Sequence, residues 1–164
     1  HDLKSANVLL FVTAGALTPK LTDFGLTKLA RGTTTHSSSV QGGAGTCQWK
    51  APEQFYNNFE PKSEVYSYGI ILWELLHGVR PWEGTLEAAV AHQVANEGRR
   101  PDVTVADGFL RQLMNKCWEQ EAADRPAFAE VVAKLAPRLR TFETSSYKAA
   151  YDATPPVIHH HVLL

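Results

Sequence analysis

The chain has 164 residues, of which 44% are hydrophobic and 20% are charged, and its formal net charge is −1 at pH 7. This composition is typical of one globular domain and argues against a disordered chain or a basic nucleic-acid-binding surface. No apolar run reaches the roughly 20 residues of a membrane-spanning helix. Cys47 and Cys117 are too isolated for a disulfide framework or a zinc site. We expect a cytoplasmic protein with no membrane segment and no nucleic-acid partner.

The first predicted element is a small β-hairpin. Residues 8–11 and 20–22 are strand-like, and the turn-rich residues 13–18 lie between them. Asn7 precedes the first strand and Asp23 follows the second, so a hairpin would bring these two side chains together. A carboxylate and an amide oxygen side by side suit Mg²⁺, which takes oxygen ligands and shares them with phosphates.

Two further side chains near Asn7 suit phosphoryl transfer. Asp2 lies five residues before Asn7 and could orient a hydroxyl group and take its proton. Lys4 could offset the charge on a moving phosphoryl group. The alternative is a hairpin with scattered acids on a solvated face.

Three motifs in this order resemble the catalytic half of a eukaryotic protein kinase. They are Asp2-Leu3-Lys4-Ser5-Ala6-Asn7, Asp23-Phe24-Gly25 and Ala51-Pro52-Glu53, which match the family's catalytic-loop, D-F-G and A-P-E signatures. The resemblance implies that Asp2 is the catalytic base and that Asn7 and Asp23 bind Mg²⁺. It also implies that Lys4, Asn7 and Asp23 lie at the ATP phosphates.

Two features resemble the serine/threonine kinases of this family. Lys4 stands two positions after Asp2, and Gly45-Thr46 matches a substrate-binding segment whose Thr contacts the catalytic Asp. The pattern over residues 68–82 resembles the tyrosine-kinase-like group of Ser/Thr kinases. The resemblance therefore implies protein substrates that carry Ser or Thr.

The chain departs from the family pattern at two positions. His1 stands where the family has an Arg that pairs with an activation-loop phosphate; alternatively, His1 is the family's His and the Arg is deleted, and the spacing leaves both open. Glu64 stands where the family's central helix carries an Asp that holds the catalytic loop. Both departures mildly favour a non-catalytic scaffold.

Residues 31–39 resemble the activation loop of the family in their place between the D-F-G and A-P-E motifs. Their many hydroxyls, beside glycine and without apolar periodicity, predict a loop that phosphorylation could order. The candidate phosphosites are Thr33, Thr34, Thr35, Ser37, Ser38 and Ser39. The alternative is a solvated linker in which no single hydroxyl matters.

Glu53 and Arg125 are a predicted pair that only the resemblance connects. In the family, the Glu of A-P-E forms a buried ion pair with an Arg from a C-terminal helix, and Arg125 lies in the matching Asp-Arg-Pro motif. The alternative is two unpaired surface residues.

Four helices are predicted after the activation loop, over residues 63–77, 86–96, 109–118 and 128–135, with the last ending by Pro137. The first begins at Ser63 as N-cap, stops before Gly78 and is apolar on every side, so it should be buried. The residues expected to face inward from the next two helices are Leu86, Ala89, Val90 and Val94, then Leu110, Leu113, Met114, Cys117 and Trp118.

Residues 1–140 are expected to form the kinase C-lobe, and residues 141–164 a flexible tail without periodicity. The run of three His at 159–161 could bind a metal but lacks further ligands. Arg99 and Arg100 could dock a substrate or simply be solvated. The chain contains no glycine-rich phosphate cover and no strand Lys for the phosphates, so we expect the N-lobe to be absent from it.

The prediction is thus a mostly α-helical, protein-kinase-like C-lobe with a small β-hairpin. It forms part of a serine/threonine kinase that transfers the γ-phosphoryl group of ATP to protein substrates, with Mg²⁺, and it is inactive as an isolated fragment. The alternative is a pseudokinase-like scaffold that binds partners without phosphotransfer.

Overall fold

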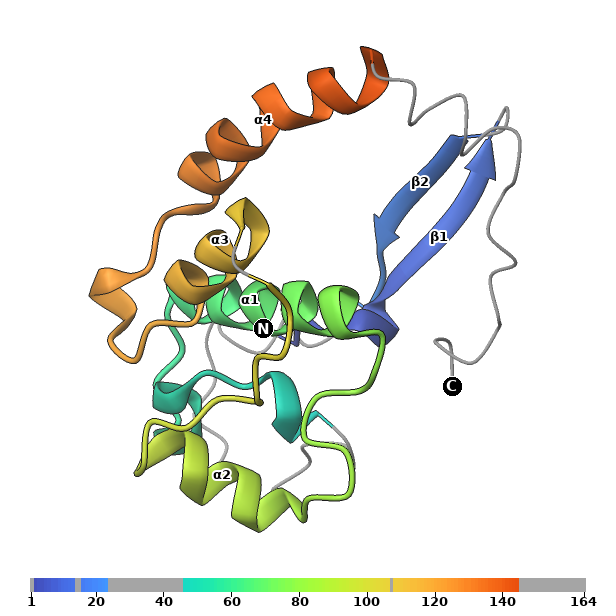
Figure 1. Ribbon diagram of the computed structural model, residues 1–164. Coiled ribbons are helices and arrows are strands. Elements are labelled where there is room, and N and C mark those ends of the chain that lie inside the picture. The colour runs from blue at the N-terminus through green and yellow to red at the C-terminus, as the bar shows by residue number, and fades with distance from the viewer. Residues whose placement is uncertain (1, 14–15, 24–45, 107, 145–164) are drawn as a thin grey trace, which may run out of the picture. The chain divides into compact units, whose positions relative to one another are not determined.

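The computed structural model describes residues 2–13, 16–23, 46–106 and 108–144 (Figure 1). His1, Phe24, Gly25, Gly45, the candidate phosphosites and the residues beyond 144 lie outside this part of the chain. The described residues form four α-helices, several 3₁₀ turns and one two-stranded sheet. The predicted fold class, mostly α with one small β-hairpin, is confirmed. The chain divides into two compact units, His1–Arg125 and Pro126–Leu164.

The hairpin pairs β1 (Val8–Thr13) with β2 (Ala16–Leu21) in antiparallel register, with Val8 opposite Leu21 and Thr13 opposite Ala16. The expected turn over residues 13–18 is too long, because Thr13 belongs to β1 and residues 16–18 belong to β2, in which Pro19 also lies. Proline is tolerated there because both strands of a two-stranded sheet are edge strands, where a missing N–H need not break the ladder.

Helix α1 (Pro61–His77) is the buried centre of the first unit. It begins two residues before the predicted N-cap, since Glu60 is the N-cap and Pro61 the first helical residue. Ser63 lies one turn in, and its hydroxyl accepts a hydrogen bond from the Glu60 N–H at 3.2 Å. The helix ends as predicted at Gly78, whose φ of +68° places it in the left-handed region.

Helices α2 (Glu87–Ala95) and α3 (Phe109–Cys117) complete this unit. Helix α3 packs directly on α1 at Gly69, where an added Cβ would meet the Cβ of Cys117 at 3.0 Å. Helix α2 contacts the 3₁₀ turns Cys47–Trp49 and Pro52–Tyr56.

Most of the predicted inward residues of these two helices are buried: Val90, Val94, Leu113, Met114, Cys117 and Trp118. Leu86 and Leu110 are not, because they are 79% and 40% exposed. Leu86 is the N-cap of α2, and its side chain therefore falls before the helical face that points inward.

The second unit contains α4 (Phe128–Thr144). The prediction that this helix ends by Pro137 is wrong, because the helix continues through the proline to Thr144. A proline inside a helix removes one backbone hydrogen bond without forbidding the helix. Residues 141–144, predicted as part of the tail, are helical, and residues 145–164 lie outside the described part.

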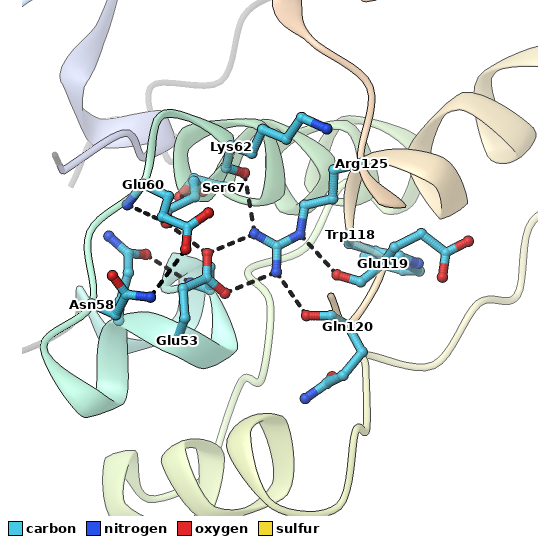
Figure 2. Close-up of polar contacts among 12 residues, drawn as sticks. Glu53, Asn58, Glu60, Lys62, Ser67, Trp118, Glu119, Gln120 and Arg125 are labelled. Carbon is cyan, nitrogen blue, oxygen red and sulfur yellow. Dashed lines mark hydrogen bonds and ion pairs between the residues drawn. The ribbon is translucent and has the colours of Figure 1, made fainter. Parts of the chain in front are cut away.

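Arg125 is a fully buried cation that ties three segments of the first unit together (Figure 2). Its two terminal nitrogens donate to the two carboxylate oxygens of Glu53 at 2.7 and 2.8 Å. The remaining donors reach the backbone carbonyls of Lys62, Glu119 and Gln120 at 2.8–3.1 Å. All five N–H groups of the guanidinium therefore have an acceptor. The pairing with Glu53 that the resemblance implied is present.

Glu53 is held in its ionised form by this arrangement. Burial acts to raise its pKa, but hydrogen bonds from Arg125 and from the Ser63 hydroxyl outweigh burial and lower it below its ordinary value. A carboxyl group whose pKa is lowered by folding stabilises the fold above its unfolded pKa, and this contribution is lost as the pH falls through the folded pKa.

We expect Arg125→Met to lower the free energy of unfolding by about 3–5 kcal/mol, because it leaves the Glu53 carboxylate without its cation. Urea denaturation of the full-length protein measures this change. Lys116→Met is the matched control, since it breaks the exposed Lys116–Glu119 pair and should cost less than about 1 kcal/mol. Equal costs for the two variants would contradict a stabilising role for the buried pair.

Candidate active site

The loop before β1 folds back on itself and brings Asp2 and Asn7 together. It ends in the 3₁₀ turn Ser5–Asn7, in which the Asn7 N–H donates to the Lys4 carbonyl at 3.0 Å. The side-chain amide of Asn7 donates to the Asp2 carbonyl at 2.7 Å and to Asp2 Oδ2 at 3.4 Å. Asn7 is buried, so these contacts fix both its position and its orientation.

Lys4 links this loop to a segment far along the chain. Its Nζ lies 2.9 Å from Asp2 Oδ2 and donates to Thr46 Oγ1, also at 2.9 Å. The side chains of Lys4 and Asp2 are only 20% and 12% exposed, so solvent screens their attraction less than it would on an open surface. The structure thus gathers Asp2, Lys4, Asn7 and Thr46 into one cluster.

The hairpin returns the chain to this cluster at Asp23. The backbone N–H of Thr22 donates to the Asn7 carbonyl at 2.9 Å, so Asp23 follows a residue that is bonded to Asn7. Asp23 is exposed and has a φ of +58°, in the left-handed region that few non-glycine residues adopt. Strained backbone of this kind often marks a functional position.

The residues present fit a magnesium ion. Because the Asn7 amide NH₂ is committed to a backbone carbonyl, its carbonyl oxygen is the atom left to serve as a ligand. An amide oxygen and the exposed Asp23 carboxylate are the hard oxygen donors that Mg²⁺ takes alongside phosphates and water. The described residues, this site included, contain no group of three or more His, Cys, Asp or Glu side chains that could hold a metal ion, so an ion here would rely on phosphate and water for its other ligands.

Glu74 of α1, which no sequence-based prediction named as a site residue, contacts two residues next to the cluster. Its carboxylate accepts hydrogen bonds from the Ser5 hydroxyl at 3.0 Å and from the Trp49 indole N–H at 3.2 Å. A signal was available, because Glu74 is the only charged residue in the apolar stretch 65–76. A carboxylate inside a buried helix needs hydrogen-bond partners.

The sequence also singled out Glu64, Arg99 and Arg100. Glu64 is in the first turn of α1. The Arg100 guanidinium donates to the Trp118 carbonyl and to Gln120 Oε1, both at 2.9 Å, and lies 4.9 Å from the centroid of the Tyr66 ring. Arg100 is therefore partly buried and held by residues 118 and 120, whereas the Arg99 side chain is 61% exposed.

In the described part of the chain, no helix is long and apolar enough to cross a membrane.

Residues 1–135 match the family described as "Protein tyrosine and serine/threonine kinase". "Probable serine/threonine-protein kinase SIS8" of Arabidopsis thaliana is 38% identical to the chain over 137 residues, which are 82% of the chain and 13% of that protein. "Serine/threonine/tyrosine-protein kinase HT1" of the same plant is 35% identical, over 82% of the chain and 33% of that protein. "Ephrin type-A receptor 8" of Mus musculus is 32% identical, over 95% of the chain and 15% of that protein.

The chain thus spans between 13% and 33% of the length of these three relatives. Its mostly helical fold with one hairpin is consistent with the C-terminal lobe of a protein kinase. Because the match covers residues 1–135 of 164, the chain belongs to the protein tyrosine and serine/threonine kinase family.

Proposed function

We propose that the protein transfers the γ-phosphoryl group of ATP to Ser or Thr hydroxyls of protein substrates. The observation that supports this most directly is the position of the Lys4 ammonium, 2.9 Å from both Asp2 Oδ2 and Thr46 Oγ1. The carboxylate can take the proton of a substrate hydroxyl, the ammonium can offset the charge of the phosphoryl group, and the Thr46 hydroxyl holds the ammonium in position.

In this proposal Asp2 is the general base. The substrate hydroxyl oxygen forms a bond to the γ-phosphorus while the bond from that phosphorus to the β–γ bridging oxygen breaks, and ADP leaves. The hydroxyl proton passes to the Asp2 carboxylate, which Asn7 and Lys4 hold in place. Lys4 offsets the negative charge of the transferring group.

Asn7 and Asp23 would hold Mg²⁺ at the phosphates. When bound, the ion neutralises phosphate charge and aligns the terminal phosphate for in-line attack. The Asn7 amide is oriented for this by its bond to the Asp2 carbonyl, and the hairpin returns Asp23 to the same place. The glycine-rich cover and strand Lys of the family signature are not among the 164 residues, so we propose that this chain alone does not phosphorylate proteins.

In this proposal, specificity for Ser and Thr depends on Lys4 and Thr46. Gly45, the other predicted substrate-binding residue, lies outside the described residues. Two of the three relatives carry "serine/threonine" in their names, one of them as "serine/threonine/tyrosine". The Lys4–Thr46 hydrogen bond holds the Lys4 ammonium beside the Asp2 carboxylate. The resemblance of Lys4 and Thr46 to the matching residues of serine/threonine kinases supports Ser or Thr as the acceptor.

We expect Asp2→Asn in the full-length protein to lower kcat by about 10²–10⁴, the usual contribution of a general base, and to leave the affinity for Mg-ATP nearly unchanged. Steady-state phosphorylation of a protein substrate and nucleotide titration measure the two quantities. Glu97→Gln makes the same chemical change at an exposed acid and should keep full activity. An Asp2→Asn variant as active as the parent would remove Asp2 from the mechanism.

We expect Thr46→Val to lower kcat/KM for Ser and Thr peptides by about 10–100-fold, since it removes the hydroxyl that accepts a hydrogen bond from a charged donor without changing side-chain volume. Peptide phosphorylation with Ser, Thr and Tyr acceptors gives the comparison. Thr46→Ser keeps the hydroxyl and should retain most activity. If Thr46→Val and Thr46→Ser behave alike, the Lys4–Thr46 bond has no part in specificity.

A further inference from the structure

One carboxylate of α1 connects the catalytic loop with the segment from Thr46 to Trp49, in addition to the Lys4–Thr46 hydrogen bond. Glu74 uses both of its oxygens, one for Ser5 and one for Trp49, which lie 69 and 25 residues away in sequence. Ser5 directly follows Lys4 in the catalytic loop. Trp49 closes the 3₁₀ turn that begins after Thr46, and its backbone N–H donates to the Thr46 carbonyl at 3.3 Å.

These contacts form a closed ring. Lys4 bonds to Thr46, Thr46 bonds through its backbone to Trp49, Trp49 bonds to Glu74, and Glu74 bonds to Ser5, the neighbour of Lys4. A shift of either segment would therefore have to break at least one of these bonds. Glu74 is the member that belongs to neither segment.

Resting on the proposed function, we propose that Glu74 is a positioning residue that holds the catalytic loop and the segment from Thr46 to Trp49 in the alignment that phosphoryl transfer needs.

Trp49 is well suited to transmit this constraint. Its side chain is buried, its carbonyl accepts from the Ser67 hydroxyl of α1 at 2.8 Å, and the Arg80 guanidinium lies 5.5 Å from the ring centroid. Without Glu74, the indole N–H would be left buried beside an apolar helix, which is unfavourable enough to displace the ring. A displaced Trp49 would carry Thr46 with it.

Fold stability alone does not account for a carboxylate at this position. Burial raises the pKa of Glu74, and the hydrogen bonds from Ser5 and Trp49 and the charge of Arg80 offset burial only in part. A carboxyl group whose pKa is raised by folding contributes stability below its unfolded pKa and loses that contribution as the pH rises through the folded pKa. The ionised side chain is thus a cost to the fold.

Glutamine offers a matched test. Its amide oxygen can accept from the Trp49 N–H while its NH₂ group donates to Ser5, whose hydroxyl can turn to accept. Glu74→Gln therefore keeps both hydrogen bonds and removes the charge, whereas Glu74→Leu removes both bonds at similar volume.

In the full-length protein we expect Glu74→Leu to lower kcat for protein phosphorylation by about 10²-fold, because sub-ångström alignment is lost, with the KM for ATP nearly unchanged. We expect Glu74→Gln to keep at least a third of parent activity and to be no less stable to urea. Ser5→Ala and Trp49→Phe each remove one of the two hydrogen bonds of Glu74 and should lower kcat less than Glu74→Leu does. Combined with Glu74→Leu, neither should lower kcat further, because the bond it removes is already absent.

Three results would overturn the proposal. The first is a Glu74→Leu variant with the kcat of the parent, and the second is a fall in kcat that only reflects unfolding of the domain. The third is an equal fall in kcat in Glu74→Gln and Glu74→Leu. The last would indicate that Glu74 acts through its charge, for example on a basic substrate residue, and a raised KM for basic peptides would identify that case.

Hydrogen exchange separates this proposal from the proposed function. If the parent protein transfers no phosphate, the proposed function fails, but the ring is still testable. Glu74→Leu should speed exchange at the Asn7 and Trp49 amides, which are bonded to the Lys4 and Thr46 carbonyls, and Glu74→Gln should not. Unchanged exchange in Glu74→Leu would overturn the positioning role independently of activity.

Discussion

The arrangement of the first unit depends on the hydrogen bonds of three polar side chains that α1 presents to the interior, where a polar group without a partner is costly. Ser63, Ser67 and Glu74 are spaced by four and seven residues, so they share one face of the helix. Their partners are Glu53, the Trp49 carbonyl and the Trp49 indole, all within residues 49–53. The central helix therefore holds the segment after the activation loop through hydrogen bonds, at defined positions that apolar packing alone would not specify.

Two partly buried carboxylates play opposite parts in this framework. Glu53 meets a guanidinium whose five donors are all used, so its pKa is lowered and its ionised form stabilises the fold. Burial raises the pKa of Glu74, and its hydrogen bonds from a hydroxyl and an indole N–H offset burial only in part. Glu53 is therefore suited to stabilising the fold. Glu74 is suited to aligning the site, at some cost in the stability of the fold. This difference follows from the partners, since both side chains are glutamates.

The sequence predicted what depends on local pattern and chain order. The hairpin that returns Asp23 to Asn7, the buried helix before Gly78 and the mostly α class all follow from periodicity, turn residues and caps. Local signals misplaced boundaries where tertiary context decides: Thr18 and Pro19 entered a strand because it is an edge, Ser63 served as N3 instead of N-cap, and α4 continued through Pro137. The Ser5–Glu74–Trp49 link joins residues up to 69 positions apart, and only the folded chain shows it.

The most direct test of the account is label transfer from γ-labelled ATP to a generic protein substrate by the full-length protein, compared with its Asp23→Ala variant in the presence of Mg²⁺. The account predicts transfer by the parent and its loss in Asp23→Ala, because that carboxylate follows the residue bonded to Asn7 and supplies a charged oxygen for the ion. A folded parent protein that transfers no label would contradict the account and favour a scaffold that binds partners without phosphotransfer.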